Sequence, residues 1–270
     1  MKKVSVIGSS GFLGKIISSN LKEFEIIPVT RKDLDLLNFK SVQNWLKKVN
    51  PDVIVNCAIA GGNNRTSDLK KTNLSDAQDN LVSFLNFYNN SDLVKKYINI
   101  GSGAEFDVRN NIDSFEESQI FNSIPDESYG FSKNIISRLI YEKQQYYTIR
   151  LFGCFDSTEA ETRFFKKVLN RKIHNYLDRR FDYISAKDFL KVLKYFILND
   201  NLPKDINCVY SEKKKLSEIL SFFKTEVKSN GIDNRNYTGD SKKIQSLNIK
   251  FDGLKKGIED YSTDLENIDE

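Results

Sequence analysis

The stretch that decides the fold is "VIGSSGFLG", residues 6–14. It places Gly8, Gly11 and Gly14 directly after a short apolar run and at the start of an amphipathic segment, a pattern that predicts a strand, a tight turn and a helix. Glycine there lets the backbone approach a pyrophosphate closely, and the helix N-terminus then binds the anionic charge. The spacing G-x-x-G-x-x-G differs from the G-x-G-x-x-G of common dehydrogenases, and a glycine-rich turn without a ligand is the alternative. The stretch therefore predicts a dinucleotide-binding turn.

The first half of the chain continues this alternation of apolar strands and helices. Such a pattern is typical of a parallel sheet covered on both faces. We predict an α/β fold, a Rossmann-type doubly wound parallel sheet with a small α+β C-terminal lobe. The predicted NADP-binding domain spans residues 1–155, and residues 156–270 form mainly a substrate-binding lobe, with some segments returning to the sheet. The predicted strands are residues 2–8, 25–30, 51–59, 95–102 and 146–153.

Composition argues against several classes of protein. Of the 270 residues 39% are apolar and 29% charged, and the net charge of +4 forms no basic stripe, which disfavours nucleic-acid binding. No apolar run approaches the roughly 18 residues of a membrane span, and Lys15 interrupts the apolar start before a signal peptide could form. Three widely spaced cysteines, Cys57, Cys154 and Cys208, suit reduced thiols, and a single histidine cannot build a multi-histidine metal site. We expect a cytoplasmic protein with no metal and no nucleic-acid or membrane partner.

The end of the second strand predicts which dinucleotide is bound. NAD-specific sites usually carry a carboxylate about 20 residues after the glycines. This chain has Thr30, Arg31 and Lys32 there, and cations attract the 2′-phosphate of NADP. NADP(H) is therefore favoured and NAD(H) remains possible, whereas a solvated basic turn is the alternative.

Three further residues form a candidate proton-transfer set. Ser102 ends a predicted strand, where a hydroxyl faces the crevice in which parallel sheets bind ligands. Tyr129 and Lys133 lie four residues apart on one face of a predicted helix. A phenol with a pKa of about 10 needs help to act near neutral pH, and a lysine cation favours the phenolate. Each residue alone is more often structural, but their order after the glycine turn predicts catalysis.

With these motifs the sequence resembles the extended short-chain dehydrogenases, the NAD-dependent epimerase/dehydratase family, and most closely its GDP-fucose synthase and dTDP-4-dehydrorhamnose reductase groups. The resemblance covers nearly the whole chain and includes "VTRKDLDLLNFKSVQNWLKKVNPDVIVNCAIAGG" at residues 29–62. It implies Ser102, Tyr129 and Lys133 as the catalytic triad. The cofactor contacts that it implies are Gly8, Ser10, Gly11, Phe12, Leu13, Gly14, Arg31, Asp35, Leu36, Cys57, Ala58, Ala60, Tyr129 and Lys133.

Departures from the family pattern concern the substrate. GDP-fucose synthases epimerise their sugar with a cysteine two residues after the serine and a histidine in the lobe. Here the cysteine position is Ala104, and Arg163 lies near the place of the histidine. The residues for proton exchange at C3 and C5 are therefore absent, while those for hydride transfer remain. The candidate substrate contacts are Gly103, Ala104, Glu105, Arg163 and Arg180.

The sequence thus predicts an oxidoreductase of deoxysugar biosynthesis, an NADPH-dependent reductase of a nucleotide-linked 4-keto-6-deoxyhexose. An NAD-linked nucleotide-sugar C4 epimerase is the first alternative. A non-catalytic cofactor-sensing protein is the second, although such proteins typically lose the tyrosine or the lysine. The nucleotide sugar is the expected partner, and the family resemblance implies a homodimer.

Overall fold

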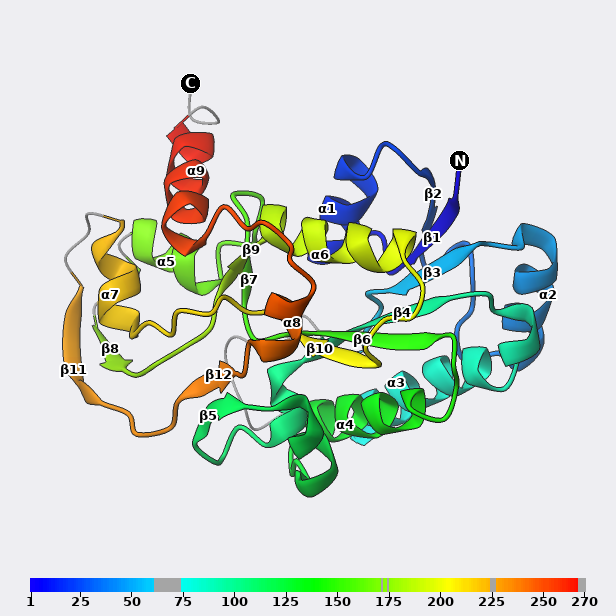
Figure 1. Ribbon diagram of the computed structural model, residues 1–270, viewed down its shortest axis with the longest axis horizontal. Coiled ribbons are helices and arrows are strands. Elements are labelled where there is room, and N and C mark those ends of the chain that lie inside the picture. Colours follow the sequence, from blue (N-terminus) through cyan, green and yellow to red (C-terminus); the bar gives the residue numbers. More distant parts are fainter. Residues whose placement is uncertain (61–73, 171, 174, 224–226, 267–270) are drawn as a thin grey trace.

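The protein is built on one parallel six-stranded sheet (Figure 1). The computed structural model describes residues 1–60, 74–170, 172–173, 175–223 and 227–266. The strand order places β1 between β2 and β3, so the direction of winding reverses beside β1, where doubly wound sheets bind ligands. This confirms the predicted fold class. From one edge to the other the strands are β10 (Asp205–Asn207), β6 (Tyr146–Leu151), β4 (Tyr97–Ser102), β3 (Val53–Asn56), β1 (Lys3–Ile7) and β2 (Glu25–Val29).

Helices cover both faces of the sheet (Figure 1). On one face Ile17 of α1 and Phe189 of α6 share a core with Val4 and Val6. On the other face lie α2, α3 and α4, whose apolar residues form a second core with Ile7. Because both faces are covered, the central strands are buried along their length, which explains their continuous apolar runs. The helices are α1 (Phe12–Asn20), α2 (Phe39–Val49), α3 (Leu74–Tyr88), α4 (Ser128–Ile140) and α6 (Ala186–Leu198).

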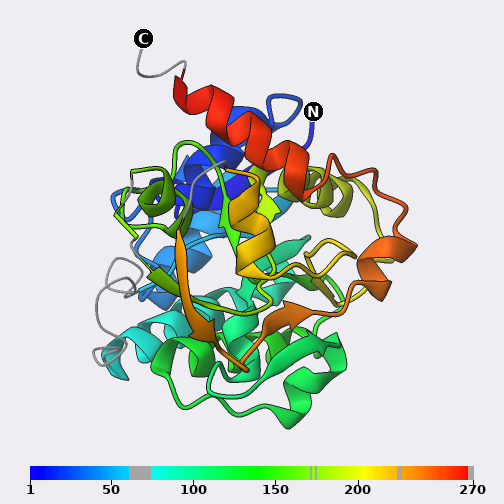
Figure 2. The same ribbon diagram turned by 90° about the vertical axis from the view of Figure 1, so that its left-hand side faces the viewer.

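The remaining elements form a lobe built from short pieces. Its strands join in parallel pairs, β11 with β8, β12 with β5 and β7 with β9. An aromatic and aliphatic cluster joins α5, α7 and α9, and α9 lies on the outside of the molecule in both views (Figures 1 and 2). The elements are β5 (Ile112–Phe115), β7 (Cys154–Phe155), α5 (Phe164–Leu169), β8 (Asn175–Asp178), β9 (Ile184–Ser185), α7 (Leu216–Ser221), β11 (Lys228–Ile232), β12 (Tyr237–Gly239), α8 (Lys242–Ser246) and α9 (Leu254–Glu266).

The chain crosses between lobe and sheet more than once. After β7 and β9 it returns through α6 and β10 to the sheet, and only then completes the lobe. The described residues also include the 3-10 helices η2 (Ser91–Leu93), η3 (Gly103–Phe106) and η4 (Glu117–Asn122). Among the described residues, no helix combines the length and the hydropathy needed to cross a membrane.

Candidate active site

The glycine turn is shaped by close approaches of backbone to backbone. Gly8 has a φ of +78°, and a Cβ there would lie 2.7 Å from the amide nitrogen of Ala58. A Cβ on Gly14 would collide with the carbonyl oxygen of Gly8. The amides of Gly8 and Ser9 both donate to the carbonyl of Val29, over 2.9 and 3.1 Å. Only glycine fits these positions, so the turn remains free of side chains where a pyrophosphate would approach.

The predicted cofactor contacts lie around this turn. Ser10 and Gly11 are exposed, and Phe12 and Leu13 are half-buried at the start of α1. The half-buried residues Cys57, Ala58 and Ala60 follow the carboxyl end of β3, and the amide of Cys57 donates to the carbonyl of Ile7 over 2.9 Å. The structure therefore brings the ends of β1, β2 and β3 together in one place, as a dinucleotide site requires.

The exposed cations predicted at the end of β2 are present. Arg31 and Lys32 are both exposed. The carboxylate of Asp33 accepts hydrogen bonds from the amide and the hydroxyl of Thr30 over 2.8 and 2.7 Å, and these bonds lower the pKa of Asp33. The Asp33 carboxylate is thus bound to Thr30 and not paired with Arg31 or Lys32. Of the other predicted contacts, Asp35 is exposed and Leu36 is half-buried.

The helix with Tyr129 and Lys133, the predicted catalytic helix, is anchored to the strand that carries Ser102. Lys133 is 4% exposed, and its Nζ donates to the carbonyl oxygen of Ile100 over 2.8 Å, two residues before Ser102. Tyr129 is half-buried in the first turn of α4. A Cβ on Gly130 would lie 2.5 Å from the carbonyl oxygen of Ala104, so α4 approaches the turn after Ser102 as closely as backbone allows. The three predicted catalytic residues therefore belong to two elements in direct contact.

The prediction from sequence missed Asn80, a buried asparagine of α3. Its Oδ1 accepts from the amide of Ala60 over 2.8 Å, and its Nδ2 donates to Ser132 over 3.4 Å. The Ser132 hydroxyl in turn donates to the carbonyl of Tyr129 over 2.9 Å. Asn80 thus links the end of β3 to the catalytic helix. The only signal in the sequence is an amide on the apolar face of a predicted helix.

The structure contradicts the predicted substrate contact of Glu105. This residue has no exposed surface. One carboxylate oxygen accepts from the amide of Ser102 over 2.8 Å, and the other accepts from Arg150 over 2.7 Å. With both oxygens bound inside the protein, Glu105 has no group to offer a sugar.

The other candidate substrate residues contact different parts of the molecule. Gly103 and Ala104 are buried, and the Phe152 ring adjoins the place where Gly103 lacks a side chain. The guanidinium of Arg163 lies over the Phe12 ring, 4.7 Å from its centroid, and therefore places a cation of the lobe beside the glycine turn. Arg180 is paired with Asp113 of β5 over 3.4 Å.

Two further features limit the chemistry of the described part of the chain. Burial raises the pKa of the Cys154 thiol, as expected for an unreactive structural cysteine near this site. Within the described ranges no three His, Cys, Asp or Glu side chains are grouped so that they could hold a metal ion.

Comparison with known proteins agrees with this geometry. The family model described as the NAD dependent epimerase/dehydratase family matches residues 4–208. The chain belongs to this family. Membership confirms the resemblance found in the sequence and the prediction of an NAD(P)-dependent enzyme of the extended short-chain dehydrogenase type. No curated protein matches the sequence.

Three solved structures of similar fold are enzymes named for nucleotide-linked sugars. The dTDP-4-dehydrorhamnose reductase of Bacillus anthracis in complex with NADP has a TM-score of 0.82 at 18% identity, over 98% of this chain and 99% of that one. A GDP-D-glycero-L-gluco-heptose synthase of Campylobacter jejuni, in the presence of NADPH, has a TM-score of 0.77 at 19% identity, over 97% and 98%. A GDP-L-fucose synthetase of Naegleria fowleri has a TM-score of 0.78 at 17% identity, over 99% and 96%. At such identities the likeness establishes the fold.

Proposed function

We propose that the protein is an NADPH-dependent reductase of a nucleotide-linked 4-keto-6-deoxyhexose. The observation that carries the proposal is the contact between the turn of Ser102 and the helix of Tyr129 and Lys133, which is fixed by the bond from Lys133 to the carbonyl of Ile100. The three similar structures described above belong to nucleotide-sugar enzymes, two of them crystallised with NADP or NADPH. This supports the same class of substrate.

The glycine turn fits a dinucleotide because Gly8 and Gly14 leave only backbone at its floor. Bound NADPH would supply the hydride for C4 of the sugar. Arg31 and Lys32 would bind the 2′-phosphate, since both cations are exposed and the nearby Asp33 carboxylate is held by Thr30. The Arg163 guanidinium beside Phe12, which is paired with Glu159 over 2.8 Å, would offer the pyrophosphate a hydrogen-bond donor.

The side chains of the protein would then polarise the ketone of the sugar and transfer one proton to its oxygen. Ser102 would donate a hydrogen bond to the ketone oxygen and polarise it. Tyr129 would give its phenolic proton to the oxyanion that forms at C4. Lys133, buried and oriented by Ile100, would stabilise the resulting phenolate and would bind the nicotinamide ribose. Ala104 and Arg163 replace the cysteine and histidine of the epimerising relatives, so we propose reduction without epimerisation at C3 or C5.

The lobe from residue 156 onward would bind the nucleotide and would provide Arg180 as a candidate contact. We further propose a homodimer through the outer faces of α3 and α4. Sedimentation of the purified protein tests this, because a single monomeric species would contradict it.

The proposal is tested by measuring the loss of reduced nicotinamide absorbance with a panel of 4-keto-6-deoxy nucleotide sugars. We expect turnover of one panel member with NADPH, and a loss of about 10²–10⁴-fold in Tyr129→Phe. Tyr146→Phe is the matched control, because this tyrosine at the amino end of β6 donates to the carbonyl of Phe87 over 2.8 Å and should change turnover by less than about threefold. If the protein instead interconverts C4 isomers of a nucleotide sugar with NAD⁺, the proposed reductase activity is wrong and the C4 epimerase is the function.

A further inference from the structure

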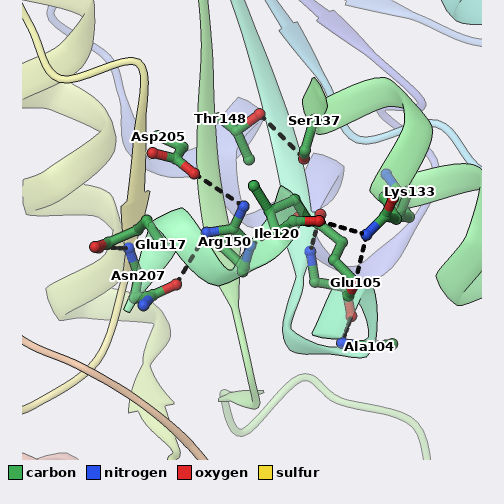
Figure 3. Close-up of polar contacts among 12 residues, drawn as sticks. Ala104, Glu105, Glu117, Ile120, Lys133, Ser137, Thr148, Arg150, Asp205 and Asn207 are labelled. Carbon is green, nitrogen blue, oxygen red and sulfur yellow. Dashed lines mark hydrogen bonds and ion pairs between the residues drawn. The ribbon is translucent and has the colours of Figure 1, made fainter. Parts of the chain in front are cut away.

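A group of buried charges around Arg150 includes Glu105, a residue of the turn that follows Ser102 (Figure 3). Arg150, in β6, has no exposed surface, and its Nε donates to Glu105 over 2.7 Å. Its terminal nitrogens donate to Asp205 over 3.1 Å and to Asn207 over 3.0 Å, both from β10. Buried ion pairs often stabilise a fold no better than apolar residues of similar volume. Stability alone therefore does not account for this group.

Glu105 connects the buried charge to the catalytic turn. Its Oε2 belongs to the ion pair with Arg150, whereas its Oε1 accepts from the amide of Ser102 over 2.8 Å. A Cβ on Gly101 would lie 2.6 Å from this second oxygen. Glycine at position 101 therefore leaves the space in which the carboxylate reaches the backbone of Ser102.

The same turn also holds the oxygen of the Ser102 side chain. The Ser102 Oγ accepts a hydrogen bond from the amide of Ala104 over 3.2 Å, and Glu105 completes the reciprocal pair as a capping box. The amide of Ala104 uses a lone pair of this oxygen and does not use its hydrogen, so the hydroxyl can still donate to a ketone. The two bonds hold residues 102–105 in one turn, so loss of the carboxylate would release the hydroxyl as well.

The same turn is tied to the catalytic helix by Asn134, the neighbour of Lys133. Its Nδ2 donates to the carbonyl of Glu105 over 2.8 Å and to the carbonyls of Ile120 and Ser123 over 3.2 and 3.0 Å. Asn134 is buried in α4. The turn with the serine and the helix with the tyrosine and lysine are thus held in one arrangement from both sides.

We propose that Glu105 is a positioning residue for the reduction, with Arg150 as its counter-ion. It holds the Ser102 turn so that the hydroxyl donates toward the ketone, and it does not itself contact the substrate. This inference rests on the proposed function and deepens it, because it assigns the orientation of the serine to a carboxylate in the interior.

The main variant is Glu105→Gln, which keeps the shape and removes the charge. In glutamine one of the two accepting oxygens becomes a donating NH2 group, which cannot accept from Arg150 or from the amide of Ser102. We expect the remaining oxygen to face the Arg150 cation, so that the Ser102 turn is released. We predict a fall in kcat of roughly 10- to 100-fold, with KM and the Kd of NADPH within about threefold of wild type. Asp188→Asn is the matched control: this carboxylate is also buried but accepts from the Tyr210 hydroxyl and the amide of Gly253, away from Arg150 and the Ser102 turn, and kcat should stay within about threefold. Equal losses in the two variants, or an unchanged kcat in Glu105→Gln, would overturn the proposal.

A double-mutant cycle separates positioning from general damage. If Glu105 acts through the serine, Glu105→Gln should lower kcat by less than about threefold when Ser102→Ala is already present. Losses that multiply would show an independent effect and contradict the proposal. Should Glu105→Gln not fold, Glu105→Asp replaces it, because the shorter carboxylate keeps the charge but cannot reach both Arg150 and the amide of Ser102.

Hydrogen exchange at the Ser102 amide makes the test independent of any substrate. The bond to Glu105 should protect this amide, and Glu105→Gln should raise its exchange rate by at least about tenfold. Unchanged exchange would overturn the positioning role even in an active enzyme. If no sugar is reduced but the exchange rate rises, the proposed function fails while the structural part of the inference stands.

Discussion

The catalytic end of the sheet and the C-terminal lobe are held together in different ways. At the sheet, elements meet backbone to backbone, as where Gly8 approaches Ala58 and Gly130 approaches Ala104. In the lobe, elements meet through rings: the centroid of Phe165 lies 4.8 Å from that of Phe155. Backbone contact admits glycine alone, whereas ring packing tolerates many apolar residues. The first kind of contact leaves a motif in the sequence, and the second does not.

The largest difference in stability between the two regions is expected when a glycine within a helix is replaced by alanine, once at the sheet and once in the lobe. Gly14→Ala directs a methyl group into the backbone of the glycine turn, whereas Gly257→Ala in α9 meets side chains of Ser185 and Phe155. We expect Gly14→Ala to lower the free energy of unfolding by roughly 3–4 kcal/mol and to weaken NADPH binding at least about 30-fold. In Gly257→Ala the helix propensity of alanine, worth about 1 kcal/mol, offsets most of the crowding.

Urea unfolding and NADPH titration of both variants measure these effects. Similar destabilisation by both, or NADPH binding unchanged in Gly14→Ala, would show that the two regions do not differ in this way.

A smaller effect should distinguish the lobe by its response to pH. Asp182 is 4% exposed, and burial raises its pKa to about 6 despite its bonds to Lys213 and the amide of Gly239. Since the folded pKa lies above the unfolded value of 3.8, the protonated form favours folding. This contribution is fully present below pH 3.8 and is lost as the pH rises through about 6. The loss amounts to about 2–3 kcal/mol.

The measurement is the free energy of unfolding between these pH values, for wild type and for Asp182→Asn. The wild type should lose more stability with rising pH than the variant does. Parallel curves would contradict the raised pKa and remove this difference between lobe and sheet.

The smallest effect concerns the choice between NADPH and NADH, which should depend on residues at the end of the sheet and not on the lobe. Arg31→Ala should raise the Kd of NADPH about tenfold, since one exposed cation near a phosphate is lost, and should leave the Kd of NADH within about twofold. Lys228→Ala, which removes an exposed cation of β11 in the lobe, is the control and should change neither. Equal weakening of NADPH and NADH in Arg31→Ala would place the arginine away from the 2′-phosphate.

Sequence patterns were sufficient for the parts that depend on the backbone. The glycine turn, the apolar strands and the helix with Tyr129 and Lys133 follow from local periodicity and spacing, and the structure contains them where they were predicted. The grouping of Ser102 with this helix was implied by the family resemblance and does not come from local spacing, unlike these other features. These features are local, so neighbouring residues in the chain contain the information.

The parts that failed depend on distant partners. Arg150 lies within the apolar run "YYTIRLFG", and its partners Asp205 and Asn207 come 55 and 57 residues later. In the sequence Glu105 looks like a surface residue, because it is a charged residue next to a polar loop. Its burial is explained only by Arg150, 45 residues away. Asn80 likewise receives its role from Ala60 and Ser132. Such pairings require the topology of the sheet, which spacing alone does not provide.

The central claim, net reduction at the sugar C4, is tested most directly with NADPH carrying deuterium at the transferring position of the nicotinamide. As the 4-keto-6-deoxy nucleotide sugar is consumed, its product should carry deuterium at C4, in an amount equal to that of the NADP⁺ formed. Tyr129→Phe should abolish the deuterium transfer and the formation of NADP⁺. Interconversion of two C4 isomers with no net NADPH consumption, or a product without deuterium at C4, would contradict the account.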